Sequence, residues 1–313
     1  MNKCFATIIT SDYLPYANAL LECLTEYCSD INLYVLVSDS PSTLLKKETH
    51  LRLMTLISYE DLIKNAVGQS IHDKYYESYH DAFRWSMKPV LIGYLLDEYE
   101  KVIYVDCDVH FFNDHDFLFK LLDKHNILLS PHFRSSDPVK DSSNFFLQFN
   151  AGLFNGGFVA ANKGGKEAMI WWAKACDYIC EKSPCKGQFD DQTHLNLLPV
   201  FFEDVHIIKH RGCNVANWNL LECERTFVEN ELLINKEYPL VFIHFTGSTI
   251  RGIINGNDSM LRPHFDKYNE RLLANGLDES LFDKYSVNAI PQPSSFKRFV
   301  RFVKKQIRFT ANF

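Results

Sequence analysis

Residues 102–108, VIYVDCD, decide the fold, because four apolar residues run directly into two aspartates that are one residue apart. Such an apolar run, rich in β-branched residues, is typical of a buried strand. In open α/β sheets, ligands bind at the carboxyl ends of the strands. Asp106 and Asp108 at such an end can share one hard cation, and oxygen ligands suit Mg²⁺ or Mn²⁺. The alternative is an acidic turn without a ligand, because aspartate is common in turns.

Short apolar runs alternate with amphipathic stretches on both sides of this segment. We expect strands at 4–10, 33–37, 54–57, 102–105, 127–130, 157–161, 204–209 and 240–245. We expect helices at 13–27, 43–53, 72–99 and 165–181, the third of them broken by Pro89. Residues 132–149, polar and then aromatic, predict a mobile loop over a cleft. Strands that alternate with helices predict an α/β fold, with a mostly parallel sheet and helices on both faces.

The composition is that of a globular protein with a substantial core, since 46% of the 313 residues are hydrophobic. The net charge of −6 gives no reason to expect a nucleic-acid partner. No apolar run approaches the length that crosses a bilayer, and the chain starts without a signal-peptide pattern. Nine scattered cysteines suit reduced thiols. We therefore expect a cytoplasmic protein with one domain over residues 1–288.

The end of the chain differs in composition from the rest. A linker containing proline and serine spans 289–295, and a basic tail spans 296–313. Residues 296–309, FKRFVRFVKKQIRF, hold six cations and no acid. At helical periodicity most of their apolar residues share one side and the cations share the other. We expect an amphipathic helix on an anionic membrane surface, which would make the protein peripheral on the inner face of the membrane. The alternative is a terminal helix that packs its apolar side on the core.

Several motifs along residues 4–250 occur in a consistent order. They are ATIIT at 6–10 with Tyr13, FRWSMKP at 83–89, the aspartates, FNGGFVA at 154–160, WW at 171–172, DQ at 191–192, GCNVANWN at 212–219 and HFTG at 244–247. With these motifs the chain resembles bacterial glycosyltransferases of the GT-A fold. It is similar, more distantly, to glycosyltransferase family 8, the group that includes glycogenin. The chain departs from family 8 at Thr193, where a second aspartate is common, and at Ile250, where a lysine is common.

The resemblance implies a Rossmann-like GT-A fold and metal-dependent transfer of a hexose or N-acetylhexosamine from a nucleotide sugar. The base is implied to be uracil, the metal Mn²⁺ or Mg²⁺, and the acceptor a glycan or a lipid-linked glycan. Synthesis of lipopolysaccharide or another cell-surface polysaccharide is the implied setting. Retention of the anomeric configuration is favoured over inversion.

The resemblance also assigns roles to residues. The implied catalytic group is Asp191, with Asp190 as the adjacent alternative and Gln192 beside it. The implied metal ligands are Asp106, Asp108 and His244. The implied nucleotide-sugar contacts are Thr10, Tyr13, Arg84, Lys88, Asp106, Asn155, Gly156, Gly157, Gly247 and Arg251. The implied sugar or acceptor pocket contains Asn214, Asn217, Trp218 and Asn219.

Structural roles compete with these assignments. His244 lies in an apolar run and could be a core histidine. Arg84 and Lys88 lie four residues apart, hence on one helix face, and could simply be solvated. Residues 155–157 could be a turn before a strand, and Trp218 could be a core side chain.

Other functions compete as well. DCDV at 106–109 also matches the nucleophile loop of haloacid-dehalogenase-like phosphatases, with Asp190 and Asp191 as later metal ligands. Those enzymes usually carry the loop on the first strand of the core, whereas about a hundred residues come earlier here. A catalytically silent sugar-nucleotide-binding protein is a third possibility. A sugar-1-phosphate nucleotidyltransferase is a fourth, although the chain has no N-terminal glycine-rich loop containing arginine.

Overall fold

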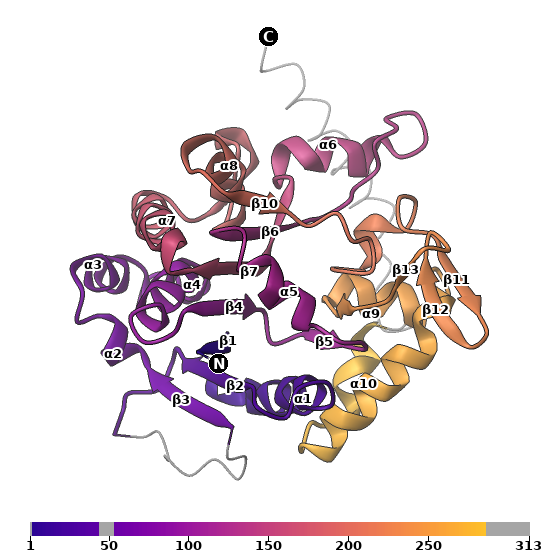
Figure 1. Cartoon of the computed structure of the whole chain (residues 1–313), viewed down its shortest axis with the longest axis horizontal. Coiled ribbons are helices and arrows are strands. Elements are labelled where there is room, and N and C mark those ends of the chain that lie inside the picture. Colours follow the sequence, from indigo (N-terminus) through magenta and orange to yellow (C-terminus); the bar gives the residue numbers. More distant parts are fainter. Residues whose placement is uncertain (1, 44–52, 286–313) are drawn as a thin grey trace, which may run out of the picture.

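A seven-stranded sheet forms the centre of the molecule in the computed structural model, which describes residues 2–43 and 53–285 (Figure 1). The helix expected at 43–53, the linker at 289–295 and the tail at 296–313 lie, apart from residues 43 and 53, outside the described residues. They stay predictions, as does the domain boundary at residue 288.

The order of strands across the sheet is β10 (Val205–Ile207), β6 (Ile127–Pro131), β7 (Phe154–Asn162), β4 (Lys101–Val105), β1 (Lys3–Ile9), β2 (Asn32–Val37) and β3 (Met54–Ser58). Four of the six neighbouring pairs are parallel. Strand β7 is antiparallel to both β4 and β6. The sheet is therefore mostly parallel, and the expected α/β class is confirmed.

Helices cover both faces of the sheet. The α-helices of the described residues are α1 (Leu14–Thr25), α2 (Tyr59–Leu62), α3 (Ala66–Tyr75), α4 (His80–Leu95), α5 (Asp116–Leu121), α6 (Ser142–Asn150), α7 (Lys166–Tyr178), α8 (Leu198–Phe201), α9 (Gly247–Ile254) and α10 (Arg262–Ala274). Within the described ranges, none of the helices is both long and apolar enough to cross a membrane.

The alternation of side chains along the strands explains this arrangement. Cys4, Ala6 and Ile8 of β1 pack in one core with α3, α4 and α7, and Phe5 and Ile9 pack in the other with α1 and α5. In Figure 1 the first group of helices lies to the left of the sheet and the second to its right. A parallel sheet needs cover on both faces, because its strands are apolar on both sides.

Three small sheets lie outside the central one. Strand β5 (Val109–Phe111) pairs with β14 (Phe242–His244), and β8 (Lys182–Ser183) pairs with β9 (Gln188–Phe189). The third sheet contains β11 (Arg225–Val228), β12 (Glu231–Ile234) and β13 (Tyr238–Pro239). This third sheet packs with α9 and α10 around a separate core.

The helix expected at 72–99 is confirmed in part, because most of these residues are helical, but the break expected at Pro89 is wrong. The chain forms α3 and α4 instead, and Pro89 lies inside α4 without ending it. A proline inside a helix removes one hydrogen bond. Here that loss is offset by packing, because Phe83, Met87 and Leu91 of α4 are fully buried in one core with α7.

The expected loop at 132–149 is partly wrong, because its second half forms α6. The carboxylate of Asp141 caps this helix by accepting a hydrogen bond from the backbone N–H of Asn144 at 2.9 Å. Residues 132–141 contain no helix or strand.

A buried ion pair fixes the segment that leads into β11. Nη2 of Arg225 lies 3.1 Å from the carboxylate of Asp258, and both side chains are less than 5% exposed. The guanidinium also donates hydrogen bonds to the carbonyls of Ala216 and Asn219. Burial raises the pKa of Asp258 and lowers the pKa of Arg225, so each charge depends on the other.

We predict that Asp258→Ala lowers the free energy of unfolding by about 3–5 kcal/mol, because it leaves the Arg225 charge buried and unpaired. Urea denaturation of both proteins measures the difference. The control is Asp61→Ala, which removes an exposed partner of Lys64 and should change stability by less than about 0.5 kcal/mol. A loss below about 1 kcal/mol in Asp258→Ala would contradict the importance of the pair.

Candidate functional site

Pairing between β5 and β14 brings three polar side chains together. Strand β4 ends at Val105, a tight turn follows, and β5 begins at Val109. His244 lies opposite Val109 in the antiparallel register of β5 with β14. His244 is therefore a neighbour of Asp108, although more than a hundred residues separate them in the sequence.

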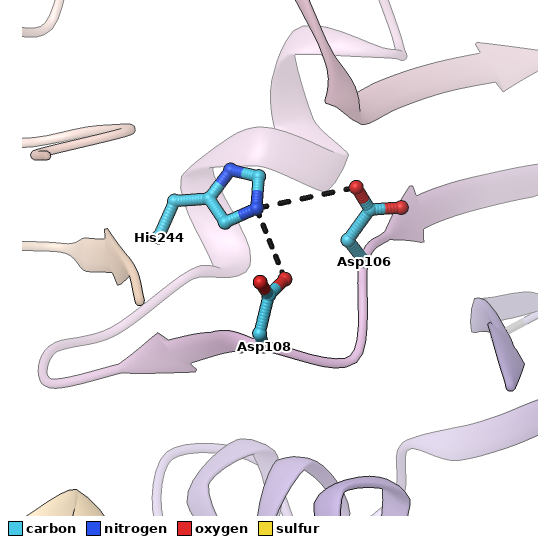
Figure 2. Close-up of side chains that lie close together, drawn as sticks. All are labelled: Asp106, Asp108 and His244. Carbon is cyan, nitrogen blue, oxygen red and sulfur yellow. Dashed lines mark ion pairs between the residues drawn. The ribbon is translucent and has the colours of Figure 1, made fainter. Parts of the chain in front are cut away.

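Asp106, Asp108 and His244 converge on one point (Figure 2). Nε2 of His244 lies 3.0 Å from Oδ1 of Asp108 and 4.0 Å from Oδ2 of Asp106. One ligand atom from each residue lies within 4.8 Å of the other two. Two carboxylate oxygens and an imidazole nitrogen suit a divalent cation such as Mn²⁺ or Mg²⁺. The metal ligands that the sequence predicted are thus brought together.

The charges of this group are coupled. Burial alone would lower the pKa of His244, but Asp108 and Asp106 raise it above its usual value. Burial alone would raise the pKa of Asp108, but His244 lowers it. Asp108 and His244 therefore each favour the charged form of the other.

The glycine pair at the start of β7 leaves space for this group. Strand β7 runs beside β4, and the backbone N–H of Asp106 donates to the carbonyl of Gly157 at 3.0 Å. A Cβ on Gly157 would lie 2.4 Å from Cε1 of His244 and 2.9 Å from Oδ2 of Asp106. A Cβ on Gly156 would lie 2.7 Å from Oδ2 of Asp191. Both positions therefore require glycine.

Lys88 of α4 links the aspartates at the end of β4 to those that follow β9. Its Nζ lies 3.2 Å from Asp106 and 3.4 Å from Asp191, and it donates to the carbonyl of Gly156 at 3.0 Å. Lys88 is only 5% exposed. Burial alone would lower the pKa of this ammonium, but Asp106 and Asp191 raise it, so Lys88 stays charged. The alternative of a solvated helix face does not apply to Lys88.

Asp190, Asp191 and Gln192 form the wall opposite the metal ligands. Asp191 is 1% exposed, and burial raises its pKa well above the usual range despite the nearby Lys88. The indole N–H of Trp172 donates to the backbone carbonyl of Asp191 at 2.9 Å. The side chain of Gln192 accepts from the backbone N–H of Gly156 at 3.2 Å, which fixes this wall to β7.

Two adjoining hollows meet at Asp106 and Asp108. The larger, of about 510 Å³, is lined by the metal ligands and by Lys88, Asp190, Asp191 and Gln192. The smaller, of about 210 Å³, is lined by Tyr13, Arg84 and Tyr104 as well as by the two aspartates. A ligand with two ends joined at the aspartates would fit this shape.

A model of the family described as Glycosyl transferase family 8 matches residues 4–249. The chain belongs to this family. It is therefore a glycosyltransferase, and the sequence resemblance is confirmed. The match places the metal ligands, the glycine pair and Asp191 within the family's own span.

The chain is also similar to two bacterial proteins and to a solved structure. The family 8 chain is 24% identical to the uncharacterized protein YfnF of Bacillus subtilis (strain 168), over 81% of this chain and 84% of YfnF. It is 27% identical to the uncharacterized protein YfnD of the same strain, over 79% of this chain and 78% of YfnD. The crystal structure of the galactosyltransferase LgtC with donor and acceptor sugar analogs superposes with a TM-score of 0.56 at 14% identity. That match covers 90% of this chain and 99% of LgtC, and it shows the GT-A fold.

Of the other residues predicted to contact the nucleotide sugar in this family 8 glycosyltransferase, some line the hollows and others lie outside them. Tyr13 and Arg84 line the smaller hollow, and Arg84 also pairs with Asp81 at 2.5 Å. Thr10 does not line it, and its hydroxyl donates to Asp12 at 2.5 Å.

Gly247 and Arg251 of α9 do not line either hollow, although Thr246 and Ser248 on the two sides of Gly247 line the larger one. A Cβ on Gly247 would lie 3.0 Å from the ring of Tyr285, so packing explains this glycine. The guanidinium of Arg251 lies 5.7 Å from the centre of the same ring.

Of the residues predicted for the sugar or acceptor pocket, two line the larger hollow and two lie behind it. Asn217 and Trp218 line the larger hollow. Asn214 and Asn219 are fully buried behind it, where they hold the loop through hydrogen bonds to Pro131 and His132. Asn155 reaches the hollow, and its amide lies 2.8 Å from Nδ1 of His244 and 2.6 Å from Asn214. Asn155 thus orients His244.

His132 and Arg134 also line the larger hollow, although the sequence predicted no role for either residue. They follow β6 in the segment expected to be a loop. Burial lowers the pKa of His132 to about 3, so its imidazole is neutral at physiological pH. Their position beside the site follows from the place of β6 in the sheet, which local sequence does not show.

We predict that Gly157→Ala weakens Mn²⁺ binding at least about tenfold, because its methyl group displaces His244 or Asp106. Mn²⁺ titration followed by electron paramagnetic resonance measures the affinity. The matched control is Gly93→Ala in α4, where a Cβ meets no atom within 4 Å and the affinity should not change. Equal Mn²⁺ affinity in both variants would show that the cation binds elsewhere.

Proposed function

We propose that this protein transfers a hexose or N-acetylhexosamine from a UDP-sugar to a glycan or lipid-linked acceptor, with Mn²⁺ or Mg²⁺ as cofactor. The supporting observation is the convergence of Asp106, Asp108 and His244 where the two hollows meet. When bound there, the cation would neutralise the diphosphate leaving group, which is the main electrostatic demand of the reaction.

The residues of the chain divide the remaining tasks. Tyr13 and Arg84 in the smaller hollow would hold the base and the ribose. Lys88 would add a fixed positive charge beside Asp106, on the side of the cleft where Asp191 lies. The sugar and the acceptor hydroxyl would occupy the larger hollow, whose walls hold them in reach of each other.

Asp191 is the group proposed to act next to the reacting sugar. It lies in the larger hollow, and Oδ2 of its carboxylate accepts no hydrogen bond within the described residues. In a retaining reaction the carboxylate would stabilise the positive charge that develops on the sugar, and in an inverting reaction it would take the acceptor proton. We favour retention, because of the family 8 likeness.

A lipid-linked acceptor at the inner face of the membrane, in synthesis of lipopolysaccharide or another surface polysaccharide, is part of the proposal. The basic sequence of residues 296–309 supports it. Helix α6 borders the larger hollow through Leu147 and exposes Phe146 and Phe149 by 59% and 67%. Exposed aromatic side chains beside the site would suit contact with lipid.

The family assignment does not support all of the alternative functions equally. Membership of family 8 argues against the haloacid-dehalogenase-like phosphatase and the nucleotidyltransferase. The catalytically silent protein differs from the proposal only in turnover, so turnover is the test.

We predict that the protein releases UDP from at least one member of a UDP-sugar panel when Mn²⁺ is present, and that EDTA stops the release. Asp108→Asn should lower the rate at least about 100-fold, because it removes a metal ligand. The matched control is Asp114→Asn at an exposed position nearby, which should keep the wild-type rate.

Two outcomes would contradict the proposal. Absence of UDP release from every donor, with or without acceptor sugars, would favour a silent binding protein. Release of phosphate from phosphomonoesters that is lost in Asp106→Asn would favour the phosphatase.

A further inference from the structure

Arg134 is a cation of the larger hollow that has no carboxylate partner within the described residues. Its Nη1 donates to the amide oxygen of Asn144 at 2.9 Å, and its guanidinium lies 5.9 Å from the centre of the Trp218 ring. Its Nε is buried and makes no hydrogen bond. A neutral amide and an aromatic face do not neutralise a guanidinium.

The other cations of the cleft are paired. Lys88 lies between Asp106 and Asp191, and Lys182 lies 3.6 Å from Asp190. Burial without any opposing carboxylate lowers the pKa of Arg134 to about 10. The guanidinium is still charged at neutral pH, and among the described residues the Asn144 hydrogen bond and the Trp218 ring offset only part of the free-energy cost of its burial.

A second unused donor lies next to Arg134. The indole Nε1 of Trp218 is buried and makes no hydrogen bond, and Trp218 lines the same hollow. Guanidinium groups match the geometry of phosphates and carboxylates, and such charge-assisted bonds are stronger than neutral ones. The chemistry of this corner therefore suits an oxyanion.

Arg134 lies in the larger hollow, which also contains Asp106, Asp108 and His244. Arg134 lines the larger hollow and not the smaller one, where Tyr13 and Arg84 lie. It belongs to the segment between β6 and α6, whereas the proposed diphosphate position is at the ends of β4 and β14. The hydrogen bond from Arg134 to Asn144 joins it to α6, so an anion at Arg134 would lie on the α6 side of this hollow.

We propose that Arg134 binds an anionic group, a phosphate or a carboxylate, carried by the acceptor glycan. This inference rests on the proposed function, because it assumes that the larger hollow receives an acceptor. It narrows the acceptor to a charged glycan, such as one bearing a sugar phosphate or a uronic acid, and disfavours a neutral one.

The test uses the indole N–H of Trp218 as a reporter in nuclear magnetic resonance spectra of the full chain with Mg²⁺ and UDP bound. The signal is assigned by its loss in Trp218→Phe. The probes are inorganic phosphate, glucose 6-phosphate, glucuronate and, as the neutral control, glucose. Wild-type protein should show a saturable shift of this signal with at least one anionic probe, at least about tenfold tighter than with glucose.

Variants of Arg134 test whether its positive charge binds the anion. Arg134→Gln should weaken the response to the anionic probe at least about tenfold, and Arg134→Lys should retain part of it. Lys140→Gln removes an exposed charge from the same segment and should respond as the wild type does. Phosphate and glucuronate arms distinguish the two kinds of anion.

Three results would overturn the inference. The first is that no anionic probe shifts the Trp218 signal. The second is that an anionic probe shifts it equally in the wild type and in Arg134→Gln. The third is that the anionic probes bind no more tightly than glucose. Failure of the proposed function is a separate result, since it would appear as absence of UDP binding or turnover. The anion titrations can be repeated without UDP in that case.

Discussion

Concentrated negative charge at one edge of the sheet is the constraint on which the site depends. Asp106, Asp108 and Asp191 line one cleft, where repulsion between ionised carboxylates has to be offset. Lys88 offsets part of it by lying between Asp106 and Asp191. The group formed by Asp106, Asp108 and His244 has the donor atoms and spacing that a divalent cation needs. A nucleoside diphosphate is a ligand that such a cation attracts.

Strands from separate parts of the chain supply the residues at this edge of the sheet. Strand β4 delivers Asp106, the β5–β14 pair aligns His244 with Asp108, and β7 contributes the glycines that make room for them. Because β7 runs antiparallel to β4, its N-terminal end lies at the carboxyl end of β4. The proposed donor-binding half is thus built from paired backbone. The proposed acceptor side comes from the irregular segment 132–141 and helix α6, and such irregular segments tolerate change without disturbing the sheet.

Local sequence predicted the features that depend on near neighbours. Periodicity and residues adjacent in the chain predict the strand that leads into Asp106, the helix that carries Lys88 and the class of the fold. The role of Asn155 beside His244 could not be predicted, because it depends on contact between β7 and β14. Pro89 was misjudged, since burial of α4 outweighs a local preference. Arg134 gave no signal, because the absence of a carboxylate partner is a property of the folded chain.

Calorimetric titration with UDP, first with Mn²⁺ and then with excess EDTA, tests the metal-dependent diphosphate site most directly. Binding with Mn²⁺ that falls below detection in EDTA is the predicted result, because Asp106, Asp108 and His244 would contact the diphosphate through the cation. Equal affinity in both conditions would contradict it, and so would absence of binding in either.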